Sequence, residues 1–555
     1  MSSRPPVHPP RRLIAALVGL AAVAVVAPLA VAPMPYLWDV PNHLARLWVL
    51  LGYATGTPVA AMYQPDWSLA WTNLGLDHLG MVLGQILPFD ALGPALVALS
   101  LLIVPAGAIV LNRALFGGPH IWHVGLFLLA WNFIVVGGLL SFQLGLGCAL
   151  FAAALDTRLT GLSRWRRFAA RAAMATGLMV VHVFGLMFFL LLLVGLDVGR
   201  RRPPVEQPIA RRLLVSRLAL ATATCLVPIA ALVVLAPRLP GAHTLPGAGA
   251  QFKATILQFP DLTVLEHLSI MLTPLKTYDL DADLLTVVAI IALPVYALVR
   301  GRLQMHFGLF WLAVVLFVLC HFVPSTLFGT GWIEKRLPAM AGLMWAASVR
   351  PQLPATARGQ VLVGCLLLGA VIARAAFIGA VWSGQQAAVR DLRAVSATIE
   401  PGSAVLVAEH FTGSVSDPRA PLGRYAHGEP IFRHLPTLLV IWRQAFVPTV
   451  FSAAGKQPLK VLPPWIELAV PEGGIPNLDE LDAPEALIDF HYLADWRRRF
   501  QYLLVINADL PHAGRQIGDI PGIREVAVSP FARLYRIEKP SGHMIRVMVP
   551  PPSLR

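Results

Sequence analysis

The chain has 555 residues, of which 56% are hydrophobic and only 13% are charged. Soluble domains carry about 25% charged residues, so this composition excludes an ordinary soluble enzyme. It also excludes a disordered chain, which needs few apolar residues and many charges. The apolar residues form long runs rather than alternating, which argues against a β-barrel. The composition therefore predicts an α-helical polytopic membrane protein.

The net charge of +14 belongs almost entirely to the first part of the chain. Residues 1–382 carry 26 basic and 13 acidic residues, whereas residues 383–555 carry 18 and 17. Basic residues gather in the cytoplasmic loops of membrane proteins, so the excess is explained by the lipid bilayer, and no nucleic-acid partner is expected. The four cysteines lie in apolar runs and lack metal-binding or disulfide spacing.

Ten apolar runs are candidates for membrane spans, each of which needs about 20 residues when it crosses as one helix. They are Leu13–Pro33, Ala91–Leu111, Ile121–Val136, Leu139–Ala154, Ala172–Leu196, Leu213–Ala236, Leu284–Val299, Phe307–Phe322, Leu337–Ser348 and Gln360–Trp382. Arginines precede the first run, which predicts a cytoplasmic N-terminus.

The run Ala172–Leu196 lies between two arginine-rich stretches, residues 156–171 and 197–217. A single span would place these stretches on opposite sides of the membrane, against the charge bias of cytoplasmic loops. We therefore expect a hairpin of two half-helices that turns near His182 and Gly185, since broken helices are tolerated where they line a cavity. This gives eleven membrane segments and an external C-terminus.

Two domains are expected. Residues 1–382 form a transmembrane domain whose first external loop is 34–90, and residues 383–555 form a soluble extracytoplasmic mixed α/β domain of ordinary size. In the second domain, Gln385–Ile399 is predicted as a helix. The predicted strands are Ala404–Glu409, Tyr502–Asn507 and Ala532–Ile537.

Polar residues crowd just outside the first span, where Asp39, Asn42, His43 and Arg46 fall within eight positions. Pro41 suits the first turn of a helix, which would place Asn42 and Arg46 on one face. A carboxylate near the helix N-terminus is favoured in its ionised form, so Asp39 is a candidate general base. The alternative is a capping aspartate beside an interfacial arginine, both serving stability alone.

This segment resembles a group of uncharacterised bacterial GT-C-type membrane glycosyltransferases, and the resemblance covers most of the chain. The stretches that carry it are Asp39–Arg46, Asn73–Asp77, Trp131–Phe133 with Gly137-Gly138, Trp332–Pro338, His434–Pro436 and Ala445–Pro448. The resemblance implies a GT-C-like fold, to which the hairpin also conforms. It further implies a sugar donor linked to polyprenyl phosphate.

GT-C enzymes place an acidic residue in the first external loop as catalytic base, and by position Asp39 is that residue. Many members have two adjacent acidic residues there, whereas Val40 follows Asp39 here. Asp39 then acts alone, or His43 assists it. A phosphate is a good leaving group, so one base and a cation for the departing phosphate would suffice. Direct displacement would invert the anomeric carbon.

Cations for that phosphate are expected on the same side of the membrane. Arg336 and Lys335 lie between two spans, and a guanidinium matches phosphate oxygens. Arg46 is a further candidate, and Glu334 is expected to pair with one of the cations. The alternative for all of them is anchoring at the lipid headgroups. His182, inside the hairpin, is a candidate substrate ligand, or else a neutral histidine bonded to backbone.

Asp279, Asp281 and Asp283 precede a span at alternate positions. Such oxygen ligands suit Mg²⁺ or Mn²⁺, but helix capping is the favoured interpretation, so no metal ligand is assigned. The C-terminal histidines, His410, His427 and His434, have no metal-binding spacing and are expected in surface or core roles.

The sequence thus predicts an inverting glycosyltransferase of the bacterial inner membrane. It would move a sugar from a polyprenyl-phosphate donor to an extracytoplasmic acceptor, which is a glycan, lipid or protein. One alternative is a transporter or flippase for a lipid-linked or envelope substrate, which also uses broken helices. The other is a non-enzymatic envelope-assembly protein.

Overall fold

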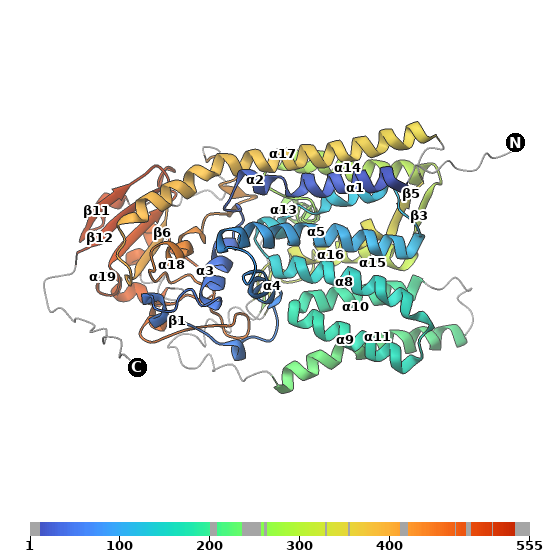
Figure 1. The fold of residues 1–555 in the computed structure, drawn as a ribbon, viewed down its shortest axis with the longest axis horizontal. Helices are drawn as coiled ribbons and strands as arrows, with labels where there is room; N and C mark the ends of the chain where they lie inside the picture. The colour runs from blue at the N-terminus through green and yellow to red at the C-terminus, as the bar shows by residue number, and fades with distance from the viewer. Residues whose placement is uncertain are drawn as a thin grey trace.

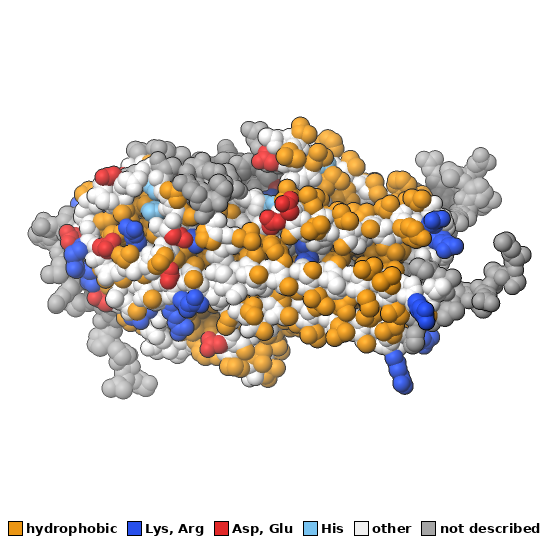
Figure 2. All heavy atoms as spheres, turned by 90° about the horizontal axis from the view of Figure 1, so that it is seen from above, with side chains coloured by type: hydrophobic (Ala, Val, Ile, Leu, Met, Phe, Trp, Pro, Cys, Tyr) orange, Lys and Arg blue, Asp and Glu red, His pale blue; other side chains and the backbone are white. Residues whose placement is uncertain are grey.

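The computed structural model describes residues 11–199, 208–235, 257–259, 263–327, 330–352, 356–410, 420–471, 473–483, 490–512, 514 and 516–538. Long helices lie side by side in a bundle, and the longer strands gather at one end of it (Figure 1). On the face seen in Figure 2, hydrophobic side chains cover much of the bundle, and Lys and Arg lie at both ends of the molecule. Such a surface suits a protein embedded in lipid.

Within the described residues, five helical stretches are long and apolar enough to cross a membrane. They are Arg11–Val31, Phe89–Phe116, Leu140–Gly161, Leu280–Val299 and Ala357–Thr398, and four shorter apolar ones are Trp122–Val136, Val183–Gly199, Val215–Ala231 and Phe307–Leu319. The prediction of a helical protein with several membrane spans is therefore confirmed. The number of eleven segments stays a prediction.

The bundle helices have the following bounds. They are α1 (Arg11–Val26), α2 (Pro28–Val31), α5 (Phe89–Phe116), α6 (Trp122–Gly125), α7 (Phe133–Val136), α8 (Leu140–Arg158), α9 (Arg164–Val181), α10 (Val183–Gly199), α11 (Pro208–Leu235), α13 (Val264–Ile270), α14 (Leu280–Val299), α15 (Phe307–Leu319), α16 (Ile333–Ser348) and α17 (Ala357–Val395). Two short helices, α3 (Val40–Leu50) and α4 (Gly75–Leu83), lie between the bundle and the strands (Figure 1).

The predicted hairpin is present, because α9 and α10 pack against each other and the chain breaks at His182, whose backbone is extended (φ −170°, ψ 130°). Its arms are longer than the predicted half-helices, with 18 and 17 residues, or about 27 and 26 Å. The first arm begins before the apolar run and includes the buried residue Arg171. The charge of Arg171 is neutralised there, since it is paired with Asp156 at 2.8 Å and lies 3.6 Å from Asp197. Residues 200–207 of the second basic stretch lie outside the described residues.

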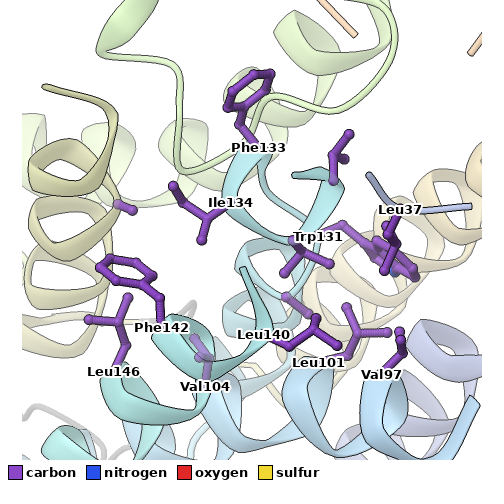
Figure 3. Packing of buried hydrophobic residues seen from close by; sticks show 14 of the residues in the cluster. Leu37, Val97, Leu101, Val104, Trp131, Phe133, Ile134, Leu140, Phe142 and Leu146 are labelled. Atoms are coloured by element: carbon purple, nitrogen blue, oxygen red, sulfur yellow. The ribbon is translucent and has the colours of Figure 1, made fainter. Parts of the chain in front are cut away.

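The predicted span Ile121–Val136 is not one regular helix. It consists of α6, a 3₁₀ turn over Leu126–Leu129 and α7, and the side chain of Asn132 caps α7 by accepting from the Val135 N–H at 3.1 Å. This segment is buried inside the bundle, and Trp131 and Ile134 belong to the apolar core drawn in Figure 3. Its burial in protein explains how an interrupted helix is tolerated there.

The strands at the end of the bundle form a four-stranded sheet in the order β11-β12-β10-β6. The strands are β6 (Val405–Glu409), β10 (Tyr502–Ile506), β11 (Ile523–Val528) and β12 (Ala532–Ile537). β10 pairs with β12 antiparallel and with β6 parallel. Three of these were predicted. β11 was missed because it lies at the sheet edge, partly exposed, and carries charged residues that break the apolar pattern.

The helical and strand-containing parts are closely joined. α17 has 39 residues and passes from the bundle to the sheet, so the predicted boundary after residue 382 falls within this helix. The predicted first external loop contains α3, α4 and β1 (Tyr63–Pro65), which pairs with β9 (Leu459–Val461). The remaining short elements are β2 (Leu257–Gln258), β3 (Leu303–Met305), β4 (Thr326–Leu327), β5 (Val349–Pro351), β7 (Tyr425–Ala426), β8 (Glu429–Pro430), α18 (Leu439–Trp442) and α19 (Trp496–Arg499).

Candidate active site

Asp39 stands immediately before α3, where Pro41 occupies the first helical turn. The Asp39 side chain makes no capping hydrogen bond, so the carboxylate does not have the capping role considered above. The backbone is held by the Gly137-Gly138 connection, because the Asp39 N–H donates to the Gly137 carbonyl at 3.3 Å. Gly138 has φ +75°, and a Cβ there would come 2.5 Å from the Asp39 nitrogen. Glycine therefore permits this close approach.

Two adjoining cavities of 300 and 210 Å³ meet at Asp39. Both are lined by Asp39, Leu139, Gly331, Arg336 and Phe451. The first cavity is completed by Trp38, Trp332, Arg433, His434, Gly473 and Gly474. The second is completed by His43, Thr72, Asn73, Ser141, Phe142, His182, Val183, Phe184, Thr330, Lys456 and Gln457. The carboxylate thus borders a space that the bundle and the C-terminal region enclose together.

Arg336 is the predicted cation that reaches the same cavities. Its guanidinium lies over the rings of Phe142 and Phe184, 5.2 and 4.8 Å from their centroids. The Nε–H donates to the Gly331 carbonyl at 3.2 Å, while Nη1 is buried and has no hydrogen-bond partner among the described residues. A buried guanidinium nitrogen without a partner is energetically unfavourable, and an anion in the cavity would satisfy it.

His43 borders the second cavity, but both of its ring nitrogens are engaged. Nδ1 lies 3.1 Å from an Arg46 nitrogen and Nε2 lies 3.2 Å from the Gly138 carbonyl oxygen. Burial, and then Arg46, hold the pKa of His43 well below its ordinary value, so the ring is neutral. Arg46 donates to Nδ1 and Nε2–H donates to Gly138, which leaves no ring lone pair to take a proton from a substrate.

Arg46 and Asn42 do not line either cavity. Arg46 is buried and paired with Asp77 at 2.8 Å. The Asn42 amide donates to the Thr449 carbonyl at 2.7 Å and accepts from the Phe451 N–H at 2.7 Å. These contacts fix α3 to its surroundings. A substrate contact for either residue stays a prediction.

Glu334 and Lys335 also lie outside the two cavities. Lys335 is paired with Glu429 at 2.8 Å and lies over the Trp332 ring, 4.6 Å from its centroid. Glu334 is buried, and its Oε2 has no hydrogen-bond partner among the described residues. The expected pairing of Glu334 with a neighbouring cation is therefore not seen at that oxygen. Of the three adjacent charged residues, only Arg336 is positioned to meet a substrate in these cavities.

His182 borders the second cavity at the break between α9 and α10. Its Nδ1 accepts a hydrogen bond from the Phe184 N–H at 3.1 Å. Its ring packs edge-on against that of Phe142, with the ring centroids 5.5 Å apart. The backbone contact matches the neutral, backbone-bonded alternative. The ring still faces the space in which a substrate would lie.

Two of the three aspartates at the start of α14 are accounted for by protein contacts. Asp279 caps α14 by accepting from the Ala282 N–H at 2.9 Å. Asp283 is buried and accepts from the Thr277 hydroxyl at 2.7 Å. The described part of the chain holds no group of three His, Cys, Asp or Glu side chains arranged to bind a metal. Dependence on Mg²⁺ or Mn²⁺ therefore stays a question for experiment.

His434 is the site residue that the sequence assigned to another role. Its Nδ1 lies 2.9 Å from Asp39 Oδ1, although the two residues are 395 positions apart. Arg433 borders the same cavity and is paired with Glu409 of β6. Only the inclusion of His434 in a motif of the resemblance marked it in the sequence, since its spacing to other polar residues indicated nothing.

The chain matches no family model, and no curated protein matches it. Its structure is similar to the crystal structure of ArnT from Cupriavidus metallidurans in the apo state, with a TM-score of 0.47 and 14% sequence identity. The similarity covers 95% of this chain and 98% of that chain.

Proposed function

We propose that this protein is a membrane glycosyltransferase that moves a sugar from a polyprenyl-phosphate donor to an extracytoplasmic acceptor. The observation that carries the proposal is the placement of the Asp39 carboxylate and the Arg336 guanidinium on the walls of the same two cavities. A base and a buried cation in one space are the groups that displacement of a phosphate by a hydroxyl requires.

In the proposed reaction, the acceptor hydroxyl attacks the anomeric carbon while its proton passes to Asp39. The bond from that carbon to the phosphate oxygen breaks, and the electron pair leaves with the lipid phosphate. Arg336 stabilises the negative charge on the departing phosphate through its unpartnered Nη1. A single displacement of this kind inverts the anomeric configuration.

A lipid-linked donor suits the position of the second cavity. It is lined by the beginnings of α8 and α10, which supply Phe142, Val183 and Phe184. Arg336 lies over two of these aromatic rings. A phosphate near this cation would therefore leave its lipid chain next to the apolar helices of the bundle. In this proposal the protein lies in the bacterial inner membrane with its strands outside.

The proposal is tested by transfer of radiolabelled sugar from a panel of polyprenyl-phosphate sugars, with purified protein in liposomes. Wild type is compared with Asp39→Asn, and exposed Asp90 supplies the matched control Asp90→Asn. We expect transfer by wild type and the control, and a loss of about 10²–10⁴-fold in kcat for Asp39→Asn. Equal turnover by Asp39→Asn would remove the assignment of the base. Saturable flux of a lipid-linked substrate without covalent transfer would instead support the transporter alternative.

A further inference from the structure

The ring of His434 joins Asp39 to the C-terminal region through two hydrogen bonds. His434 Nδ1 lies 2.9 Å from Asp39 Oδ1, and His434 Nε2 lies 3.0 Å from the Gly473 carbonyl oxygen. The His434 side chain is 7% exposed, whereas that of Asp39 is 20% exposed. The histidine is thus enclosed, and the carboxylate keeps a face toward the cavity.

The donors and acceptors in this arrangement imply that His434 and Asp39 together hold one proton more than a neutral histidine and an ionised aspartate would. The Gly473 carbonyl can only accept, so Nε2 carries a hydrogen. Nδ1 faces a carboxylate oxygen, which accepts when ionised. The contact therefore requires a second N–H on the ring, or a proton on Asp39 itself. When Asp39 is ionised and ready to act as a base, His434 is accordingly an imidazolium.

The position of the ring is fixed by its surroundings. It packs edge-on against Phe451, with centroids 4.9 Å apart, and lies 5.9 Å from the Trp38 ring. Gly473 has φ +88°, and a Cβ there would come 2.8 Å from His434 Nε2. A side chain at this position would collide with the ring, so glycine permits the close approach of its carbonyl.

We infer that His434 is a positioning residue for the proposed transfer reaction, which orients the Asp39 carboxylate and keeps its second oxygen available to the acceptor hydroxyl. This inference rests on the function proposed above. No hydrogen bond to Asp39 Oδ2 is found within the described residues, consistent with that oxygen serving the cavity. During transfer the acceptor proton moves to Oδ2. His434 keeps both of its protons and its bond to Oδ1, which remains an acceptor when Asp39 is protonated.

Other charged groups border this pair. Arg336 and Arg433 line the same cavity as Asp39 and His434. Within the described residues neither arginine makes a hydrogen bond to Asp39, so neither fixes the orientation of the carboxylate as His434 does. Because His434 sets the orientation of the Asp39 carboxylate, its removal should change kcat more than it changes binding of the donor.

The first test compares His434→Asn with wild type in the liposome transfer assay. Asparagine carries its two N–H donors on one nitrogen, whereas the imidazolium has one on each of two separate ring nitrogens, and asparagine carries no charge. We expect kcat to fall about 10–100-fold while KM for the lipid donor stays within about twofold. Exposed His491 supplies the matched control, His491→Asn, which should keep the wild-type kcat. A kcat for His434→Asn within about twofold of wild type would overturn the inference.

The second test reads the ring directly and does not depend on turnover. Full-length protein with ¹⁵N-labelled histidine is studied in detergent micelles, and the His434 signals are assigned by their absence in His434→Asn. Near pH 7, wild type should show two protonated ring nitrogens, and Asp39→Asn should show one.

A singly protonated ring in both proteins would overturn the inference even if transfer is established. Two protonated nitrogens together with no transfer from any donor would instead refute the proposed function, and with it the role of His434 in transfer. The two failures are therefore distinguishable.

Discussion

The Gly137-Gly138 connection allows the position of Asp39 to be disturbed without altering its side chain. Gly138→Ala would place a Cβ 2.5 Å from the Asp39 nitrogen and 2.9 Å from the Asp39 Cβ. Ordinary contact begins at 3.4 Å, so the Asp39 backbone must move by about 0.9 Å. A displacement of about 1 Å in a catalytic group lowers the rate about 100-fold. We therefore expect kcat for sugar transfer to fall by about that factor in Gly138→Ala.

The matched control for this variant is Gly117→Ala. Gly117 has nearly the same backbone angle, φ +79°, but nothing lies within 4 Å of its Cβ position. Both variants force alanine to a positive φ, which costs about 1–3 kcal/mol. Both should therefore lose stability in thermal melting, but Gly117→Ala should keep the wild-type kcat. Equal kcat values for the two folded variants would refute the argument that Gly138 positions Asp39.

Three further predictions concern stability, measured by thermal melting in detergent. Asn42→Ala should lower the free energy of unfolding by about 2–4 kcal/mol, because two buried backbone groups lose their partner; an unchanged melting temperature would contradict this. Burial, and then Lys335, lower the pKa of Lys276 from 10.5 to about 8, so its charged form destabilises the folded protein by about 3 kcal/mol at neutral pH. Lys276→Met should therefore be the more stable protein at pH 7. That advantage should decline between pH 8 and 10.5, as the unfolded chain also loses the proton, and a constant difference would be inconsistent with the shift. Asp156→Leu should destabilise by about 3–5 kcal/mol because it removes the main partner of buried Arg171, and adding Arg171→Leu should recover most of the loss. If the double variant recovers no stability, this would argue against the view that Asp156 stabilises the protein by neutralising the charge of Arg171.

The parts of the fold that could be predicted are those that composition and charge determine locally. The break at His182 followed from two basic stretches on either side of one apolar run. Strands β6 and β10 followed from runs of apolar residues, which strands buried on both faces require, and β12 followed from apolar residues that Arg533 and Arg536 interrupt. The interruption at Asn132 could not be predicted, because a buried segment is equally apolar whether its helix is continuous or broken.

The candidate site was predicted in part for a similar reason. Asp39 and Arg336 stand out because they are charged residues next to long apolar runs. The sequence does not show that Arg46 is paired with Asp77, or that Asn42 is hydrogen-bonded to the backbone at Phe451, since these are tertiary contacts. The contact of His434 with Asp39 spans 395 positions and has no local signature.

The central claim is that Asp39 and Arg336 serve one reaction in one space. The most direct measurement is the steady-state rate of sugar transfer against lipid-donor concentration for Asp39→Asn and Arg336→Gln, with exposed Arg302 supplying the control Arg302→Gln. We predict that Asp39→Asn lowers kcat with little change in KM. Arg336→Gln should lower kcat/KM for the donor about 10–100-fold, as expected for one lost charge-assisted hydrogen bond. Donor kinetics for Arg336→Gln that equal those of Arg302→Gln would contradict the claim.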